Sequence, residues 1–383
     1  MTDTSNDVTE IRKGHAIPKQ RLLQYLKQNI AGFQGGLDVK QFGYGQSNPT
    51  FLLTDQGSGK QFVMRKRPSG PIVSKTAHRV DREYKVMKAL SQTNVPVPKM
   101  YVLCEDDSIV GASFYIMEFK KGRIFKSPDL NDLPKKERRG IWLALIDVLA
   151  RLHNVDFRSV GLEKFGRSFG YFERQTKSLS AVSKLQLASD PSVPEIPEFD
   201  RLVNILNEQR PADAVSIVHG DFKMDNCIFH PTEPRVIAVI DWELSTIGHF
   251  GADLGNSFSP FYFPEDGDAY GSTIFGPPLS PAAALEQGLP SKEEMLNHYC
   301  NRRSPVMDFN AIRKEMYYYV GFFCWKNSII TQGVQSRVAK GQASSANAAM
   351  VGQLTPILGG LSKYMLDKYM EGHDGEKKLP SKM

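Results

Sequence analysis

Cysteine is scarce in this chain, and long apolar runs are missing. The 4 cysteines, Cys104, Cys227, Cys300 and Cys324, are widely spaced and form no CxxC pair. This spacing argues against a disulfide framework or a zinc site and indicates buried thiols in a reducing compartment. No apolar run approaches the roughly 20 residues that a membrane-spanning helix needs, so no membrane insertion is expected. The polar N-terminal stretch MTDTSNDVTEIRKGH lacks the apolar core of a secretory signal.

The chain also has only a small excess of positive over negative charge. Lys and Arg number 48 against 42 for Asp and Glu, which gives a formal net charge of +6 over 383 residues. Such an excess fits an anionic ligand as well as nucleic acid, but no dense basic run interleaved with aromatic residues supports nucleic acid as a partner. Apolar residues make up 41% and aromatic residues 10%, enough for a sizeable core, which excludes global disorder.

The pattern of apolar residues divides the chain into a strand-rich first part and a helix-rich second part. After a polar leader, residues 18–31 show helical spacing, and short strand-like stretches follow, ending with a strand at 113–119. A further helix is expected over 76–93. From about residue 120 the pattern is mainly helical, starting with 134–154. We predict two parts, 1–119 and 120–383, with a flexible tail from about residue 373.

The most informative segment is VHGDFKMDN, residues 218–226. His219, Asp221 and Asn226 are spaced as H-x-D-x-x-x-x-N, and Asp241 stands 15 residues after Asn226, at the end of the apolar run RVIAVI. Protein kinases use H-R-D-L-x-x-x-N followed by D-F-G. Phosphoryl transfer needs a carboxylate that orients and deprotonates the acceptor hydroxyl, and an amide and a second carboxylate on magnesium. We therefore predict that these three side chains converge around Mg²⁺ at a cleft between two lobes.

HGD-x-x-x-x-N followed by IDWE resembles the aminoglycoside phosphotransferase and choline kinase branch of the kinase-like superfamily. Gly220 replaces the usual Arg of protein kinases, and the likeness covers about residues 30–345. Stretches such as VMRKRPSG, HRVDREYKVMKAL and IMEFKKGRIF look closest to kinase-like domains that, in larger proteins, are fused ahead of an acyl-CoA dehydrogenase. The resemblance implies an α+β, two-lobed protein-kinase-like fold, with a small antiparallel-sheet N-lobe and a larger, mainly helical C-lobe. It also implies ATP and Mg²⁺ as cofactors.

The same resemblance assigns roles around the motif. It makes Asp221 the catalytic base and Asn226 and Asp241 the magnesium ligands. Lys223, two residues after the base, would contact the transferred phosphate, as the lysine of protein kinases does; a solvated loop lysine is the alternative. Asp253, in GADLGN, would brace the catalytic loop by accepting backbone hydrogen bonds, with His219 as a buried structural histidine.

The first part would cover the nucleotide. Glycines let a backbone approach phosphates, so GYGQSN, with Gly43, Gly45, Ser47 and Asn48 as candidates, is a possible phosphate loop. Asn48 stands where the third glycine of G-x-G-x-x-G is expected, and a plain hairpin turn is the alternative.

A strand-borne cation should follow this loop. Strand alternation puts Arg65 and Lys66 on opposite faces. The family pattern suggests that Arg65 replaces the kinase lysine and pairs with phosphate, with Lys66 as the alternative. Glu83 would be its partner on the following helix, unless it is a surface glutamate. At the end of the strand 113–119, backbone groups of Glu118 and Phe119 would contact the adenine edge.

The acceptor pocket is expected on helices of the second part. Its candidates are polar or aromatic side chains on helical segments, for each of which a surface or core role is an equal alternative: Tyr171, Arg174, Trp325, Lys326, Gln332 and Arg337. An anionic acyl-CoA would need cations, for which Lys326 and Arg337 are candidates. His249 and Trp242 lie near Asp241 in sequence, and either substrate contact or packing is open for them, with packing favoured for Trp242.

These features predict a small-molecule kinase that transfers the γ-phosphate of ATP to an alcohol. Among acceptors a hydroxyacyl-CoA is preferred by resemblance, and aminoglycoside, choline and homoserine-like alcohols stay open. The alternative is a non-catalytic module that holds nucleotide or acyl-CoA for a separate acyl-CoA dehydrogenase. Protein kinase activity is disfavoured, because no A-P-E segment follows Asp-Trp-Glu.

The last three residues suggest a location. Ser381-Lys382-Met383 differs from the peroxisomal signal Ser-Lys-Leu only in its final residue. The preceding stretch, EGHDGEKKLP, is polar and would leave these residues accessible to a receptor. We predict a peroxisomal location, with the cytoplasm as the alternative.

Overall fold

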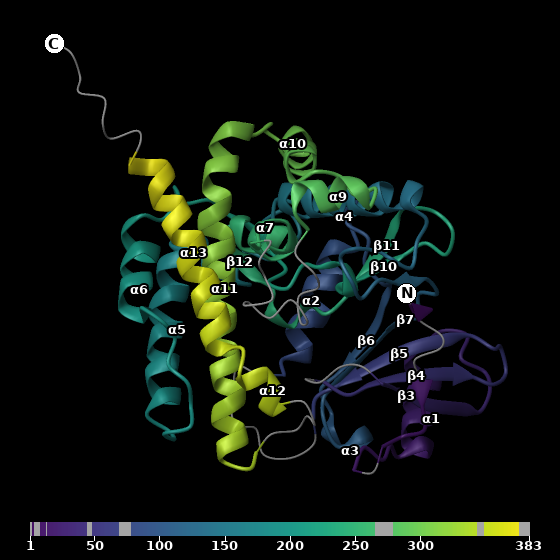
Figure 1. The fold of residues 1–383 in the computed structure, drawn as a ribbon. Helices are drawn as coiled ribbons and strands as arrows, with labels where there is room; N and C mark the ends of the chain where they lie inside the picture. Colours follow the sequence, from purple (N-terminus) through teal and green to yellow (C-terminus); the bar gives the residue numbers. More distant parts are fainter. Residues whose placement is uncertain are drawn as a thin grey trace. The chain divides into compact units, whose positions relative to one another are not determined.

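The computed structural model describes residues 2–3, 8–12, 14–43, 48–68, 78–264, 279–342 and 348–374 (Figure 1). The chain forms two compact units. Unit 1 comprises Met1–Lys126, Arg158–Leu162 and Asp225–Ser245, and unit 2 comprises Ser127–Phe157, Glu163–Met224 and Thr246–Met383. Residues 225–245, predicted to belong with 120–383, thus group with the first part of the chain. They form the β10–β11 hairpin, and β10 pairs with β8 (Arg123–Ile124), which also belongs to unit 1.

Unit 1 is built around an antiparallel sheet in the order β2-β3-β4-β5-β7-β6. Its strands are β2 (Val8–Thr9), β3 (Leu37–Phe42), β4 (Thr50–Asp55), β5 (Gln61–Lys66), β6 (Met100–Cys104) and β7 (Phe114–Glu118). Apolar side chains of one sheet face form a core with α1 (Lys19–Asn29), among them Met64 and Ile116. The predicted helix at 18–31 and strand at 113–119 are confirmed within two residues at each end.

The other face of this sheet carries polar groups toward α2 (Val80–Leu90). Arg65 of β5 and Tyr115 of β7, paired in register, both contact Glu83 of α2. A short α3 (Asp107–Val110) lies between β6 and β7. A second sheet of unit 1 joins β1 (Thr2–Asp3), β8 (Arg123–Ile124), β10 (Cys227–Phe229) and β11 (Val236–Val239) in that order. The β10–β11 hairpin carries the predicted magnesium ligands at one end.

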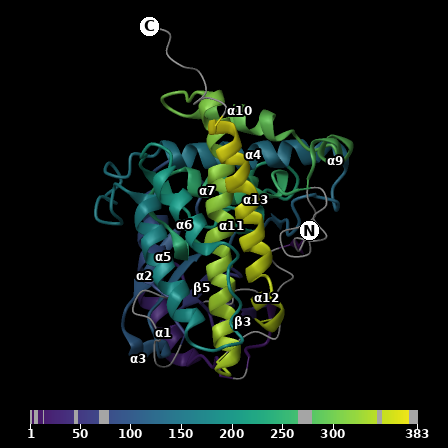
Figure 2. The same cartoon turned by 60° about the vertical axis from the view of Figure 1, so that its left-hand side comes forward.

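Unit 2 is mainly helical. Its helices are α4 (Lys135–Asn154), α5 (Tyr171–Leu187), α6 (Phe199–Glu208), α7 (Gly251–Phe258), α9 (Pro281–Glu286), α10 (Lys292–Arg302), α11 (Phe309–Ala339), α12 (Ala348–Gly352) and α13 (Thr355–Asp374). The long helices α11 and α13 run side by side in both views (Figure 2). A two-stranded sheet pairs β9 (Ser216–Val218) with β12 (Thr246–Gly248). None of the described helices has both the length and the apolar character of a membrane span.

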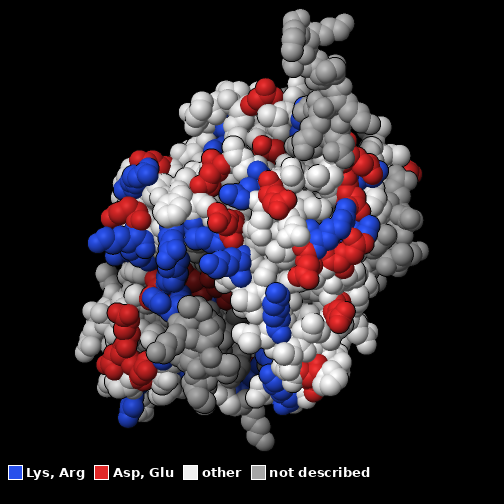
Figure 3. Space-filling view, turned by 90° about the vertical axis from the view of Figure 1, so that its left-hand side faces the viewer, with Lys and Arg blue, Asp and Glu red and all other residues white. Residues whose placement is uncertain are grey.

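Helix α7 lies very close to α11, and glycine permits this approach. A Cβ added at Gly255 would stand 2.2 Å from the carbonyl oxygen of Tyr319 on α11. The two helices therefore hold each other in a fixed position, and both carry side chains that reach the turn after β9. On the face shown in Figure 3, basic and acidic side chains are interspersed, with one denser group of basic ones, as the small net charge leads one to expect.

His249 lies within the aromatic core of unit 2. Its ring centre is 4.8 Å from that of Phe172 and 5.5 Å from that of Tyr319. The Gly251 N–H donates to Nδ1 at 3.0 Å, so Nε2 carries the proton and donates to the Ala212 carbonyl at 3.1 Å. The residue is 1% exposed, which leaves no surface for the substrate contact considered from the sequence.

The neutral ring of His249 should make stability depend on pH. Burial lowers its pKa from 6.5 to about 4. Between these values the unfolded chain binds a proton that the folded protein excludes, so the free energy of unfolding should fall by up to about 3 kcal/mol as the pH drops from 6.5 to 4. Urea unfolding at a series of pH values measures this slope. His249→Gln keeps a donor and an acceptor but does not titrate, so the pH dependence of its free energy of unfolding should be smaller between pH 6.5 and 4. An unchanged pH dependence would contradict a neutral, buried His249.

Candidate functional site

The turn after β9 is fixed by the buried carboxylate of Asp253, at the start of α7. The backbone N–H groups of His219 and Gly220 donate to its two oxygens, each at 2.8 Å, and His153 Nε2 lies 3.2 Å from Oδ2. Burial raises the pKa of Asp253, but the bonds from His153 and the His219 N–H bring it below its ordinary value. Gly220 has a φ of +87°, which favours glycine there. The bracing role predicted for Asp253 is thereby confirmed.

Asp221 follows in this turn with its carboxylate oriented. Its backbone N–H donates to His219 Nδ1 at 3.2 Å, and the Asn256 side-chain amide of α7 donates to its Oδ1 at 3.0 Å. Lys223 Nζ lies 3.5 Å from Oδ2, with 43% of its side chain exposed. Asn256 was not expected at the site from the sequence. Its position in GADLGN, one helical turn after Asp253, could have indicated that it faces the same turn.

Asn226 and Asp241 lie at the same end of the β10–β11 hairpin. Cys227 pairs with Val239, and the Ile240 N–H donates to the Asn226 carbonyl at 2.9 Å, so the two residues extend adjacent strands. Asp241 has a φ of +65°, a left-handed conformation that is uncommon for a residue with a side chain and concentrates at functional sites. Carboxylate and amide oxygens suit Mg²⁺, which takes one or two protein ligands beside substrate phosphates.

This set of ligands is smaller than that of a dedicated metal site. Over the described ranges, no three His, Cys, Asp or Glu side chains gather in a way that would hold a metal ion. Asn226 and Asp241 offer one amide and one carboxylate, and magnesium binding by them stays a prediction. Trp242, next to Asp241, is fully buried and donates to the Val239 carbonyl at 3.0 Å, so it has the packing role that the sequence favoured.

Arg65 is the strand-borne cation that pairs with the helix glutamate. Its Nε lies 3.2 Å from Glu83 Oε2, and its Nη2 lies 2.7 Å from Asp241 Oδ1 and 3.4 Å from Glu243 Oε2. Only 9% of the Arg65 side chain and none of that of Glu83 is exposed. Burial lowers the pKa of Arg65, but Glu83 and Asp241 raise it above its ordinary value. Lys66, the alternative cation, has its pKa lowered by burial, with Asp107 as the acid that opposes this shift.

Glu83 is itself held by two further groups, one of them a predicted phosphate-loop residue. The Tyr115 hydroxyl donates to Oε2 at 3.0 Å, and Asn48 Nδ2 donates to Oε1 at 2.9 Å. Asn48 is fully buried, so its side chain braces Glu83. Gly43, at the start of the loop, is exposed. Gly45 and Ser47, like Ser381-Lys382-Met383, lie outside the described residues.

The predicted adenine contacts lie at the end of β7. The Glu118 N–H donates to the Lys99 carbonyl at 2.8 Å, so this backbone donor is already bonded, and the adenine contact of Glu118 stays a prediction. Its carboxylate accepts from the Lys99 N–H and pairs with Lys120 at 2.9 Å. Phe119 follows, with its ring 6.5 Å from that of Phe42 of β3, and its backbone contact stays a prediction.

Several residues proposed for the acceptor pocket are instead part of the core of unit 2. Tyr171 is 5% exposed and Trp325 is fully buried against Phe199. Gln332 accepts from Ser183 at 2.7 Å and donates to the Pro194 carbonyl at 2.9 Å. Trp325 and Gln332 are buried because α11 is covered on several sides, so aromatic and amide groups face neighbouring helices. Tyr171, at the start of α5, is buried with its ring centre 6.2 Å from that of Phe322 of α11.

The other three candidates differ in position. Arg174 donates to the Arg167 carbonyl at 3.1 Å and lies over the ring of Phe169. Arg337 is exposed near the end of α11. Lys326 reaches the turn of Asp221, where its Nζ donates to the Gly220 carbonyl at 3.0 Å.

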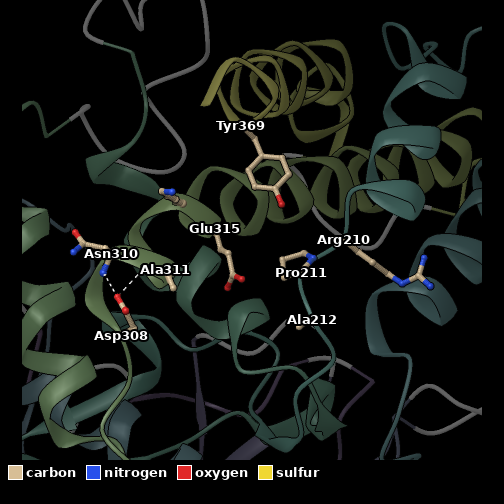
Figure 4. Close-up of a pocket in the computed structure, with 9 residues that line it drawn as sticks. Arg210, Pro211, Ala212, Asp308, Asn310, Ala311, Glu315 and Tyr369 are labelled. Carbon is tan, nitrogen blue, oxygen red and sulfur yellow. Dashed lines mark hydrogen bonds between the residues drawn. The ribbon is translucent and has the colours of Figure 1, made fainter. Parts of the chain in front are cut away.

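A separate cavity of about 510 Å³ lies in unit 2 (Figure 4). Its lining consists of Arg210, Pro211, Ala212, Asp308, Asn310, Ala311, Lys314, Glu315 and Tyr369. Asp308 caps α11 there by accepting from two backbone N–H groups. None of the predicted site residues lines this cavity. The same holds for one of about 500 Å³ in unit 1 that borders α2.

Removal of the Arg65 charge should destabilise the protein strongly. Arg65→Met would leave Glu83 buried without its cation, and breaking a buried pair costs about 3–5 kcal/mol. Arg79→Met is the matched control, because the Arg79–Asp81 pair is partly exposed, with side-chain exposures of 49% and 32%. An exposed pair contributes at most about 1 kcal/mol. Urea unfolding compares the two variants, and equal losses would show that the Arg65 cluster is not a stabilising centre.

Known proteins that are similar to this chain agree with the resemblance stated from its motifs. The sequence profile of the phosphotransferase enzyme family matches residues 38–280. Acyl-CoA dehydrogenase family member 10 of Mus musculus is 36% identical over 375 residues, which cover 97% of this chain and 33% of that protein. The chain thus spans about a third of the length of this curated relative.

Solved structures show the same relationship. A protein assigned as an aminoglycoside phosphotransferase from Ralstonia eutropha has a TM-score of 0.77 and 36% identity, covering 92% of this chain and 99% of that one. Choline kinase from Cryptosporidium parvum has a TM-score of 0.63 at 13% identity, covering 93% and 97%. The second likeness concerns the fold alone, which is protein-kinase-like, as predicted. With a profile match over more than half of its length, the chain belongs to the phosphotransferase enzyme family.

Proposed function

We propose that this phosphotransferase is an ATP-dependent small-molecule kinase that transfers the γ-phosphoryl group to a hydroxyl of a small organic acceptor. The observation that carries the proposal is the fixed turn of unit 2. Asp253 clamps the backbone before Asp221, and Asn256 fixes one oxygen of the Asp221 carboxylate at 3.0 Å. A general base must be held in a defined orientation, and the hydrogen bonds of this turn support that role for Asp221.

The other residues would bind the nucleotide and its metal. Asn226 and Asp241 would hold Mg²⁺, which supplies charge neutralisation at the transferred phosphoryl group when it is bound. Lys223, beside Asp221, would contact the same phosphoryl group. Arg65, fixed by Glu83, adds a guanidinium that binds phosphate oxygens well. The loop from Gly43 to Asn48 and the backbone at Glu118 and Phe119 would cover the phosphates and the adenine.

The preferred acceptor is a hydroxyacyl-CoA. Support comes from the 36% identity to an acyl-CoA dehydrogenase family member, a protein about three times as long as this chain. Aminoglycosides, choline and homoserine-like alcohols are the other acceptor classes. A peroxisomal location, proposed from Ser381-Lys382-Met383, would suit acyl-CoA chemistry.

A second candidate is a non-catalytic module that holds nucleotide or acyl-CoA for a separate acyl-CoA dehydrogenase. The name of the same relative favours it. The presence of Asp221, Asn226 and Asp241 together favours the kinase, since a module that only binds has no need of the base.

Asp221→Asn should abolish turnover and leave nucleotide binding intact. The amide keeps the shape of the side chain but accepts no proton, so kcat should fall by about 10²–10⁴-fold. Asp213→Asn, an exposed acid ahead of β9, is the matched control and should keep full turnover. Mass spectrometry of candidate alcohols incubated with ATP, Mg²⁺ and protein identifies the acceptor by its gain of one phosphate. Tight ATP binding without turnover of any acceptor would leave only the binding module.

A further inference from the structure

We infer that Lys326 of α11 and Asn256 of α7 are positioning residues for Asp221, the first through the backbone of its turn and the second through its carboxylate. This role rests on the proposed function for its kinetic consequences. It assigns to the site two side chains that lie outside the H-x-D-x-x-x-x-N segment, 106 and 35 residues from their partners in the chain.

Lys326 completes the fixation of one peptide group. The N–H of the peptide between Gly220 and Asp221 donates to His219 Nδ1 at 3.2 Å, and its carbonyl accepts from Lys326 Nζ at 3.0 Å. Both ends of this peptide are therefore bonded. Its plane determines the direction in which the Asp221 side chain leaves the backbone, so a change at Lys326 should be felt at the carboxylate.

The charges around Lys326 suit a positioning role. Burial lowers the pKa of its ammonium group, Asp221 and Asp253 raise it, and Lys223 lowers it. Both the Asp221 carboxylate of the turn and the Asp253 carboxylate of α7 thus act electrostatically on this ammonium group, which is held at the Gly220 carbonyl. Its neighbour Trp325 is fully buried and lies against Phe199, so α11 presents Lys326 from a rigid place.

Helix α7 provides the complementary contacts. Asp253 binds the N–H groups of His219 and Gly220, Asn256 binds Asp221 Oδ1 at 3.0 Å, and Ser257 Oγ donates to the Phe222 carbonyl at 2.8 Å. One short helix thereby holds four successive residues of the turn. The Asp221 carboxylate is thus held at Oδ1 by Asn256 and has Lys223 Nζ 3.5 Å from Oδ2.

Lys326→Met tests the backbone contact. It keeps the length of the side chain but leaves the Gly220 carbonyl without its donor. We expect kcat to fall about 10–100-fold while the KM for ATP stays within about twofold, because a small misplacement of a catalytic group has an effect of this size. Lys326→Arg, which keeps a donor, should restore part of kcat. Amide hydrogen exchange at residues 219–222 should become faster in Lys326→Met.

Asn256→Asp tests the carboxylate contact. The substitution is close in shape, but it replaces the donor by an acceptor facing Asp221 Oδ1. We expect a similar fall in kcat at unchanged ATP affinity. Ser328→Ala, two residues further along α11 with its hydroxyl bonded to the Trp325 carbonyl of the same helix, is the control and should change neither kcat nor exchange.

The outcomes separate this inference from the proposed function. The positioning role would be overturned if both Lys326→Met and Asn256→Asp kept the wild-type kcat and the wild-type exchange rates. It would also be overturned if ATP affinity fell by the same factor as kcat, because such a loss would indicate a general structural defect. If the wild-type protein phosphorylates no acceptor, the proposed function fails, and exchange at residues 219–222 still decides whether Lys326 holds the turn. If Lys326→Met does not fold, Lys326→Gln, whose shorter side chain should not reach the Gly220 carbonyl, takes its place, and Asn256→Asp tests the carboxylate contact as before.

Discussion

The hydrogen bonds of the buried Asp253 carboxylate are the interaction on which the proposed catalytic turn depends. A carboxylate taken out of water is costly unless its oxygens are satisfied. Here two consecutive backbone N–H groups and the His153 ring satisfy them. The same helix then offers Asn256 to Asp221, so the backbone that carries the proposed base and the orientation of its carboxylate have one common support. Lys326 adds a second support from α11.

A comparable arrangement organises unit 1 around one cation. Arg65 contacts Glu83, Asp241 and Glu243 within 3.4 Å, while Tyr115 and Asn48 hold Glu83 from the other side. A planar guanidinium presents several N–H groups in a fixed fork and can serve three carboxylates at once, which a lysine ammonium does less well. These contacts agree with the prediction that Arg65 takes the place of the kinase lysine. It also couples the position of Asp241, a proposed magnesium ligand, to α2.

Features that depend on a short segment could be predicted from the sequence, whereas contacts between segments far apart in the chain could not. The spacing of Asp221, Asn226 and Asp241 and the helical period of 134–154 are properties of short segments, and the structure has a helix over Lys135–Asn154. Asn256 was missed because its contact with Asp221 depends on where α7 lies. Trp325 and Gln332 were proposed for an acceptor pocket, but polar and aromatic residues on a helix covered on several sides face its neighbours. For Arg65 and Lys66, alternation left two choices, and only the position of Glu83 distinguishes them.

Transfer of the terminal phosphoryl group from ATP to a small alcohol is the central claim, and labelled ATP tests it most directly. ATP carrying ¹⁸O in the non-bridging γ-oxygens is incubated with Mg²⁺, the protein and a hydroxyacyl-CoA, and products are followed by mass spectrometry. The account predicts that the label appears in a phosphate ester of the acceptor. Label found in inorganic phosphate alone, with every acceptor class unchanged, would contradict it.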